Sequence, residues 1–402
     1  MLLKQLRAGS LPGEWRSIAS RCALLTLYLL MTVQFVGCYL FLTHPYINLD
    51  RFGQGYERLP FQTRLLFAPL FRWAEHNAFM IRYASDLSMN GYFFPHGVGP
   101  GGVIQFYIDL PCVLIAGWVA VQIYRSASRS QWLVWLVYPL FLVLCTITYI
   151  LHVVQNYRFV YDMPSLMFFA LGLYLIYFRK PVTLLVALFA VSTWNRETTI
   201  FLIPFFLLSA CVRGKPVESL RRRIAASQTR TGVAGRSARL PLMLPLSGQF
   251  ALRRTLRPAV AVPALLMAAY WTAWHVFVFH LFRHNASEYY PRIQFNLYCF
   301  RRLRYYPQLF SACGYLLPFL FVYRKRMHDV QLRVWMWMIP VWYAVMAVWG
   351  ILAETRVFGE LLPFVACAGV LIAEEGLAAA LRRHRSPETA EEGVDRHLIR
   401  AA

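Results

Sequence analysis

Charged residues are scarce in this sequence: Asp, Glu, Lys and Arg together make up 15% of its 402 residues. It contains no P-loop, GxGxxG, GxSxG or HExxH pattern, which are the motifs of nucleotide binding, serine hydrolysis and zinc hydrolysis. None of the eight cysteines belongs to a CxxC pair, so the spacing typical of zinc and redox sites is missing as well. We therefore expect neither a metal ion nor another cofactor.

Hydrophobic residues, in contrast, make up 58% of the chain, and long apolar stretches recur along it. A helix needs about 20 apolar residues to cross the hydrocarbon core of a bilayer. The composition predicts an all-α polytopic membrane protein with about eight full spans. We place these spans at 22–43, 103–124, 132–153, 164–178, 258–282, 306–323, 334–353 and 357–375.

The formal net charge is +22. In a soluble protein this excess would suggest a nucleic-acid partner. In a membrane protein the basic residues between spans set the orientation instead, and the loops richest in them stay in the cytoplasm. We therefore expect no nucleic-acid partner, and a multi-pass membrane protein with both termini cytoplasmic. The membrane we expect is a bacterial inner (plasma) membrane.

One apolar run, residues 181–211, contains three strongly polar residues at its centre: Asn195, Arg196 and Glu197. A charged side chain in the middle of a membrane-spanning helix costs about 2.5 kcal/mol or more, so such residues usually face protein or water. We interpret the break as the turn of a helical hairpin that lines a cavity. The alternatives are a simple pair between Arg196 and Glu197, or one long tilted span.

The positive-inside rule favours the hairpin. The arms, 182–194 and 198–211, are both too short for a ~30 Å hydrocarbon core. If 182–211 enters and leaves on the same side, the arginine-rich loop 212–257 stays in the cytoplasm, and most of the 41 basic residues lie there with it. A single span would move that loop outside and reverse the bias.

The remaining organisation follows from the spans. We expect a basic cytoplasmic N-terminus, a single transmembrane domain and a cytoplasmic tail, at 1–21, 22–375 and 376–402. The first outer loop, 44–102, contains an amphipathic segment at 61–83 that we expect to lie as a helix in the membrane interface. The cytoplasmic loop 212–257 should contact anionic lipid headgroups.

Polar residues gather where the predicted spans meet the outer face. They are Asp50, Glu57, Arg64, Arg158, Asp162, Arg196, Glu197, Glu354, Arg356 and Glu360. A carboxylate at the membrane edge can act as a general base, and Asp50 is the first candidate, with Glu57 the second. The alternative for either acid is a turn or helix-capping role.

Other acids in these positions also have structural interpretations. Asp162 precedes a span that begins near Pro164, so it is a candidate helix cap with Arg158 as its partner. Arg356 and Glu360 are four residues apart and pair with each other if they share a helix face. Asp109 lies within an apolar run and should face the interior of the bundle.

Three stretches together resemble the integral-membrane GT-C glycosyltransferases and their bacterial relatives. The first is GYERLPFQTRLLFAPLF, which follows Asp50 in the first outer loop. The second is YDMPSLMFFALGLYLIY, followed by the broken segment STWNRETTIFLIPF. The third is ETRVFGELLPF, which opens the last span. The chain lacks the paired acids directly after the first span and the extramembrane C-terminal domain that better-known members carry.

The resemblance implies a GT-C-like fold that moves a sugar from a polyprenyl-phosphate donor to a lipid, glycan or protein acceptor at the non-cytoplasmic face. It makes Asp50, or else Glu57, the catalytic base. The donor phosphate would be bound by the arginines of the matching stretches, Arg64, Arg158, Arg196 and Arg356. Asp162, Glu197 and Glu360 would line the cavity. The departing phosphate would be stabilised by positioned positive charge.

Three other functions fit the same sequence features. A transporter or lipid flippase would use the interrupted helix to line a substrate path, although no second broken helix occurs in a matching half of the chain. A polysaccharide polymerase or ligase of the outer leaflet would also carry arginine-rich outer loops. The last alternative is a non-catalytic membrane assembly partner.

Overall fold

The computed structural model describes residues 13–89, 98–128, 132–151, 157–212 and 258–399, which are mostly helical. The elements along the chain are α2 (Gly13–Leu42), β1 (His44–Pro45), α3 (Leu49–Gln54), η1 (Phe61–Thr63), η2 (Leu65–Phe67), α4 (Ala68–His76), α5 (Ala78–Met89), α6 (Pro100–Ala127), α7 (Val134–Tyr149), β2 (Tyr157–Arg158), α8 (Asp162–Tyr177), α9 (Val182–Thr193), η3 (Glu197–Phe201), α10 (Leu202–Cys211), α12 (Pro258–Leu281), α13 (Ile293–Phe300), η4 (Leu303–Tyr305), α14 (Tyr306–Phe310), α15 (Leu316–Tyr323), η5 (Arg324–Arg326), α16 (Val330–Trp335), α17 (Met338–Trp349), η6 (Thr355–Leu361) and α18 (Leu362–Ile399). The η elements are 3-10 turns.

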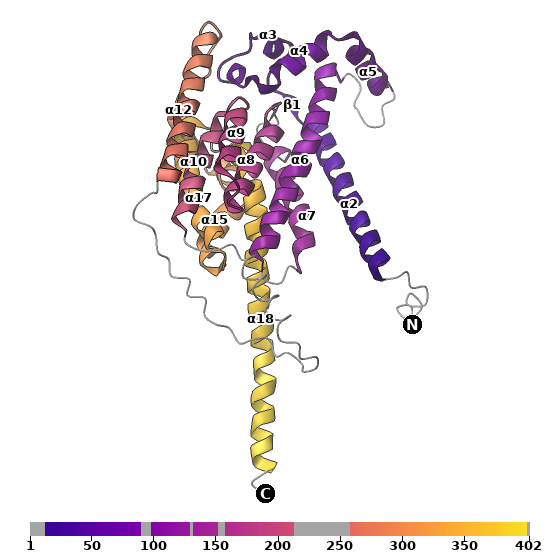
Figure 1. Ribbon diagram of the computed structural model, residues 1–402, viewed down its shortest axis with the longest axis vertical. Helices are drawn as coiled ribbons and strands as arrows, with labels where there is room; N and C mark the ends of the chain where they lie inside the picture. The colour runs from indigo at the N-terminus through magenta and orange to yellow at the C-terminus, as the bar shows by residue number, and fades with distance from the viewer. Residues whose placement is uncertain (1–12, 90–97, 129–131, 152–156, 213–257, 400–402) are drawn as a thin grey trace.

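Most of the long helices form one bundle, and three short helices lie across one end of it (Figure 1). These are α3, α4 and α5, and we call residues 44–89, which contain them, the cap. The end of the bundle that they cover is the cap end. The C-terminal part of α18 extends from the opposite end (Figure 1).

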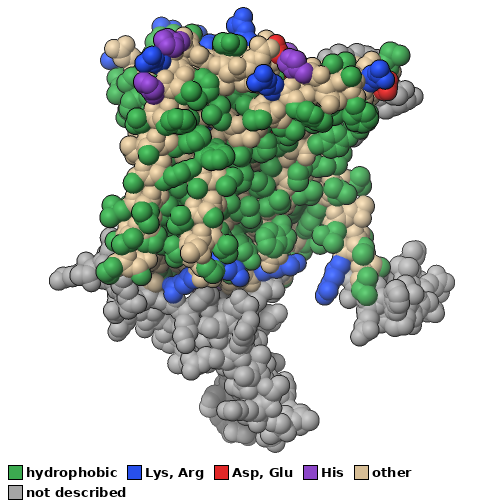
Figure 2. All heavy atoms as spheres, turned by 45° about the horizontal axis from the view of Figure 1, so that its top comes forward, with side chains coloured by type: hydrophobic (Ala, Val, Ile, Leu, Met, Phe, Trp, Pro, Cys, Tyr) green, Lys and Arg blue, Asp and Glu red, His purple; other side chains and the backbone are tan. Residues whose placement is uncertain are grey.

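Among the described residues, five helical segments are long and apolar enough to cross a membrane. They are Ile18–Leu42, Pro100–Ala127, Pro258–Leu281, Val330–Trp349 and Thr355–Ala380. Figure 2 shows hydrophobic side chains over the flank of the molecule, with Lys and Arg side chains toward its two ends. This is the architecture of an all-α membrane protein, as the composition predicts.

Three of the predicted spans take a different form. Helices α7 and α8 have 16 residues each, a length of about 24 Å that is short of a ~30 Å core. The predicted span 306–323 is two short helices, α14 and α15, with a turn between them. Cys313, Gly314 and Tyr315 all have positive φ angles in that turn, which no α-helix can accommodate. Hydropathy does not report such a break.

The chain doubles back at the polar interruption. At the start of α8, the Asn195 amide donates to the Tyr161 carbonyl at 3.2 Å and to Ser165 Oγ at 2.9 Å. Just beyond the end of α8, Arg179 Nη2 donates to the carbonyl of Val212, which follows α10, at 3.1 Å. Because α9 also begins close to Arg179, both arms start and finish at the same end of α8.

The cap is divided more finely than the sequence predicts. The expected helix over 61–83 is instead two 3-10 turns followed by α4 and α5. Asn77 separates the two helices, since its side-chain oxygen accepts hydrogen bonds from the Phe79 and Met80 amides at the start of α5. Helix α4 buries Phe71 and leaves Trp73 exposed, so its aromatic residues lie on opposite faces.

A small core fixes the cap to the bundle. Ile47, Phe52 and Phe71 of the cap pack with Phe159 and Tyr161, which immediately precede α8. Strands β1 and β2 pair in parallel beside this core. The cap and the first turn of α8 are therefore held together by both side chains and backbone.

Candidate functional site

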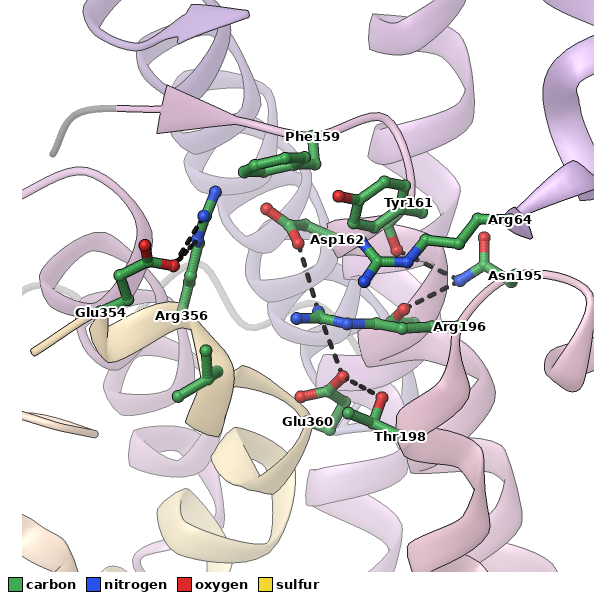
Figure 3. Close-up of polar contacts among 12 residues, drawn as sticks. Arg64, Phe159, Tyr161, Asp162, Asn195, Arg196, Thr198, Glu354, Arg356 and Glu360 are labelled. Atoms are coloured by element: carbon green, nitrogen blue, oxygen red, sulfur yellow. Dashed lines mark hydrogen bonds and ion pairs between the residues drawn. The ribbon is translucent and has the colours of Figure 1, made fainter. Parts of the chain in front are cut away.

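Charged side chains from four separate segments meet at the cap end of the bundle (Figure 3). The cap, α8, the hairpin turn and η6 each contribute to this group, which we call the buried cluster: Arg64, Asp162, Arg196, Glu197, Glu354, Arg356 and Glu360. These segments are far apart in sequence. The fold therefore brings together arginines and acids that the sequence analysis singles out separately.

Arg196 is the centre of the buried cluster. Its Nη1 lies 3.2 Å from Asp162 Oδ1 and 3.2 Å from Glu360 Oε1. Glu360 Oε1 also accepts a 2.7 Å hydrogen bond from Thr198, and Asp162 Oδ2 accepts one of 3.0 Å from Tyr39. All three ionic side chains are almost fully buried. One cation thus compensates two carboxylates that are out of contact with water.

Arg64 and Glu197 form the second ion pair of the cluster. Arg64 Nε lies 3.0 Å from Glu197 Oε2, and Nη2 contacts the other carboxylate oxygen. The guanidinium also stacks on the Tyr161 ring, 3.9 Å from its centroid. The Glu197 side chain is 32% exposed, whereas Arg64 is 7% exposed. Glu197 is therefore the member of this pair that solvent reaches.

Arg356 pairs with Glu354 and not with Glu360. Its Nη2 lies 2.7 Å and its Nε 3.1 Å from Glu354 Oε2. The expected pair with Glu360 does not form because residues 355–361 are a 3-10 segment, in which residues four apart do not share a face. The Arg356 guanidinium stacks on Phe159 at 3.8 Å.

Two aromatic residues of this site, Phe159 and Tyr161, were not among the predicted site residues. Phe159 and Tyr161 lie two residues apart in the turn that leads from β2 into α8, and each carries a guanidinium on its ring. Contacts of this kind contribute about 0.5–2 kcal/mol, more when water is excluded. The two-residue spacing of these aromatic residues beside Asp162 was the feature of the sequence that could have indicated their role.

Several buried polar atoms of the site have no hydrogen-bond partner among the described residues. Two are donors, Arg196 Nε and Arg356 Nη1, and two are acceptors, Glu360 Oε2 and Asn195 Oδ1. A buried polar group without a partner costs about 1–3 kcal/mol. A ligand that offers both acceptors and donors, such as a phosphate bearing a sugar, would satisfy both kinds.

The two proposed base residues lie in the cap, and neither hydrogen-bonds the buried cluster within the described part of the chain. Asp50 is exposed in the first turn of α3, where its Oδ1 accepts from Gln54 at 2.8 Å. Glu57 is buried and accepts from the Asn48 and Arg58 amides and from Arg58 Nε. Its oxygens are thus used to organise the loop, while Asp50 remains accessible.

Arg158 also has structural partners. It donates from Nη1 to the carbonyls of Leu40 and Thr43, at the end of α2. Burial lowers the pKa of its guanidinium from the usual value. The expected partnership with Asp162 is not seen among the described hydrogen bonds and ion pairs, where Asp162 bonds Arg196 and Tyr39 instead.

Comparison with known proteins gives no family for this chain: no family model, no curated protein and no solved structure matches it. Within the described residues, no group of three or more His, Cys, Asp or Glu side chains is arranged to hold a metal ion. Functional inference therefore depends on the chemistry of the site itself.

Proposed function

We propose that the protein is a GT-C-like glycosyltransferase that moves a sugar from a polyprenyl-phosphate donor to an acceptor at the non-cytoplasmic face of the membrane. The observation that supports it most is the set of unpaired buried atoms in the cluster. Donors on Arg196 and Arg356 match phosphate oxygens, and acceptors on Glu360 and Asn195 match sugar hydroxyls.

The proposed orientation places the cap outside the cytoplasm. Arg179 and Lys180 connect α8 to α9 at the end of the bundle opposite the cap, and η5, which reads Arg-Lys-Arg, follows α15. The basic segments 1–21 and 212–257 are joined to helix ends on the same side in this arrangement. By the positive-inside rule, that side is cytoplasmic.

The roles of the arginines follow from their present partners. Glu197 is the most exposed acid of the buried cluster, so a donor phosphate can replace it as the partner of Arg64. Arg356 and Arg196 then donate their unpaired N–H groups to the same phosphate. Charge that develops on the departing phosphate is stabilised by these fixed donors in a site largely free of water.

The proposed base is Asp50, because it is exposed while Glu57 is committed to the loop. The acceptor hydroxyl oxygen bonds to the anomeric carbon as the bond from that carbon to the phosphate oxygen breaks. Asp50 takes the hydroxyl proton, and the polyprenyl phosphate leaves with the electron pair. General-base catalysis of this type contributes about 10²–10⁴-fold to a rate.

Transfer of label from radiolabelled polyprenyl-phosphate hexoses, in membranes that contain the protein, tests this function. We expect Asp50→Asn to lower transfer by about 10²-fold or more. Asp86→Asn is the matched control, because Asp86 is another exposed cap acid and lies on α5. Unchanged transfer by both Asp50→Asn and Glu57→Gln, at normal protein abundance, would contradict the proposal.

A carrier is the second candidate function, and one observation favours it. Asp109 is fully buried within α6, and neither of its carboxylate oxygens has a hydrogen-bond partner among the described residues. Buried acids of this kind occur in proton-coupled carriers. Movement of intact polyprenyl-phosphate hexose across proteoliposomes, lost in Asp109→Asn and without release of the sugar, would favour the carrier.

A further inference from the structure

The cap contains a hollow of about 720 Å³ that is separate from the buried cluster. Residues of α3, α4 and the adjoining turns line it, chiefly Gln54, Tyr56, Arg72, Trp73, His76 and Asn77. Helices α3 and α4 meet closely beside it: a Cβ atom on Gly53 would lie 3.0 Å from the Arg72 backbone. The Arg72 backbone therefore lies directly against α3 at the wall of the hollow.

Exposed aromatic faces form part of the lining. Trp73 is 48% exposed and Tyr56 is 72% exposed. Large rigid rings with a polar tip provide contact area at little cost in conformational entropy, together with a hydrogen-bonding group. A flat, partly apolar ligand such as the face of a sugar ring fits such a lining.

The polar lining offers mainly free donors. Asn77 uses its oxygen to cap α5, which leaves its amide NH₂ available. The Arg72 guanidinium has no hydrogen bond or ion pair with any described residue, and no acid is among the lining residues. An arginine without a counter-charge prefers a planar carboxylate or a phosphate, which it binds through two parallel hydrogen bonds.

We propose that this hollow binds an acidic saccharide, one that carries carboxylate or phosphate groups. Trp73 and Tyr56 contact its ring faces, Asn77 binds hydroxyl oxygens and Arg72 binds the anionic group. The wall residue Gln54 also hydrogen-bonds Asp50 at 2.8 Å, so a bound saccharide lies beside the proposed base. Only the assignment of this saccharide as the acceptor rests on the proposed function.

Calorimetric titration of the protein in nanodiscs of neutral lipid tests the inference, with trigalacturonate, galactotriose and inorganic phosphate as probes. We expect trigalacturonate to bind most tightly. Arg72→Gln should weaken its binding about tenfold, to the level of the neutral trisaccharide. Trp73→Ala should abolish the binding of both saccharides. Arg82→Gln and Phe79→Ala change an exposed arginine and an exposed aromatic residue on α5, and should alter neither.

Three results would overturn the inference. One is saccharide binding that Arg72→Gln and Trp73→Ala leave unchanged. Another is inorganic phosphate binding as tightly as trigalacturonate, which would indicate a simple anion site. The last is the absence of saccharide binding together with binding of anionic lipid that depends on Arg72. That result would indicate that Arg72 contacts a lipid headgroup. Since no turnover is needed, these results are independent of whether Asp50→Asn stops transfer.

Discussion

The buried cluster and the hollow of the cap use arginine in opposite ways. In the cluster, Arg64, Arg196 and Arg356 each contact at least one carboxylate. In the hollow, Arg72 contacts none among the described residues. The arginines of the two regions therefore have different roles. The cluster arginines stabilise the fold and also offer hydrogen-bond donors to a ligand, whereas Arg72 is available only to bind a ligand.

Replacing Arg196 should have the largest effect on stability. Arg196→Met leaves Asp162 and Glu360 buried without their cation, and breaking a buried pair costs about 3–5 kcal/mol. Thermal unfolding in detergent measures this loss. Arg82→Met, at an exposed arginine of the cap, is the control and should unfold like the wild type. Equal unfolding of the two variants would show that the cluster is not a structural centre.

A methyl group at Gly359 should have the next largest effect. A Cβ atom there would lie 1.8 Å from the Tyr149 hydroxyl oxygen, so Gly359→Ala must displace either the buried Tyr149 ring or η6, which carries Arg356 and Glu360. Overpacking of this kind costs about 1–3 kcal/mol. Gly369→Ala on α18 is the matched control, because its nearest neighbours are 3.8 Å away. If both variants unfold at the same temperature, the contact between Tyr149 and η6 accommodates the methyl group. The buried cluster would then not be tightly packed.

Glu197→Gln tests whether a cluster arginine can be released for a ligand. The substitution removes the negative charge that competes with phosphate for Arg64, so binding of decaprenyl phosphate should become severalfold tighter. Stability should fall by about 1 kcal/mol or less, since Glu197 is partly exposed and such pairs are weak. Titration of the lipid, with Asp86→Asn as control, measures the affinity. Weaker binding would instead make Glu197 a direct ligand contact.

Arg72→Gln should have the smallest effect on stability. The Arg72 side chain is exposed and has no polar partner among the described residues. The unfolding transition of the variant should therefore coincide with that of the wild type. The thermal unfolding experiment used for Arg196→Met checks this as well. A shift as large as that of Arg196→Met would erase the contrast between the cluster and the hollow.

Sequence patterns predicted the long helices well, because hydrophobicity over about 20 residues is a strong signal. They also placed the polar interruption where the chain turns. Hydropathy did not predict the break at Cys313–Tyr315, because it depends on residue type and not on the positive φ angles of these three residues. The division of 61–83 had a local signal in Asn77, a residue type that favours helix caps.

The site was predictable in its residue types and not in its pairings. Position near the outer span ends identified Arg64, Arg196 and Glu360, because charge in apolar surroundings is costly. Which acid neutralises which arginine depends on tertiary contacts and on whether a segment is α or 3-10, as Arg356 shows. Nothing in the amphipathic segment 61–83 singled out Arg72, since its lack of a partner is a property of the folded cap.

Binding of polyprenyl phosphate tests the proposed role of the buried cluster most directly. Native mass spectrometry of the protein with decaprenyl phosphate, and with decaprenol as the uncharged control, should show a phosphate-dependent complex. Arg356→Gln removes one of the unpaired donors and should weaken that complex about tenfold, with decaprenol unaffected. Equal binding of the two lipids, or equal binding by the wild type and Arg356→Gln, would contradict the assignment of the buried cluster as a phosphate site.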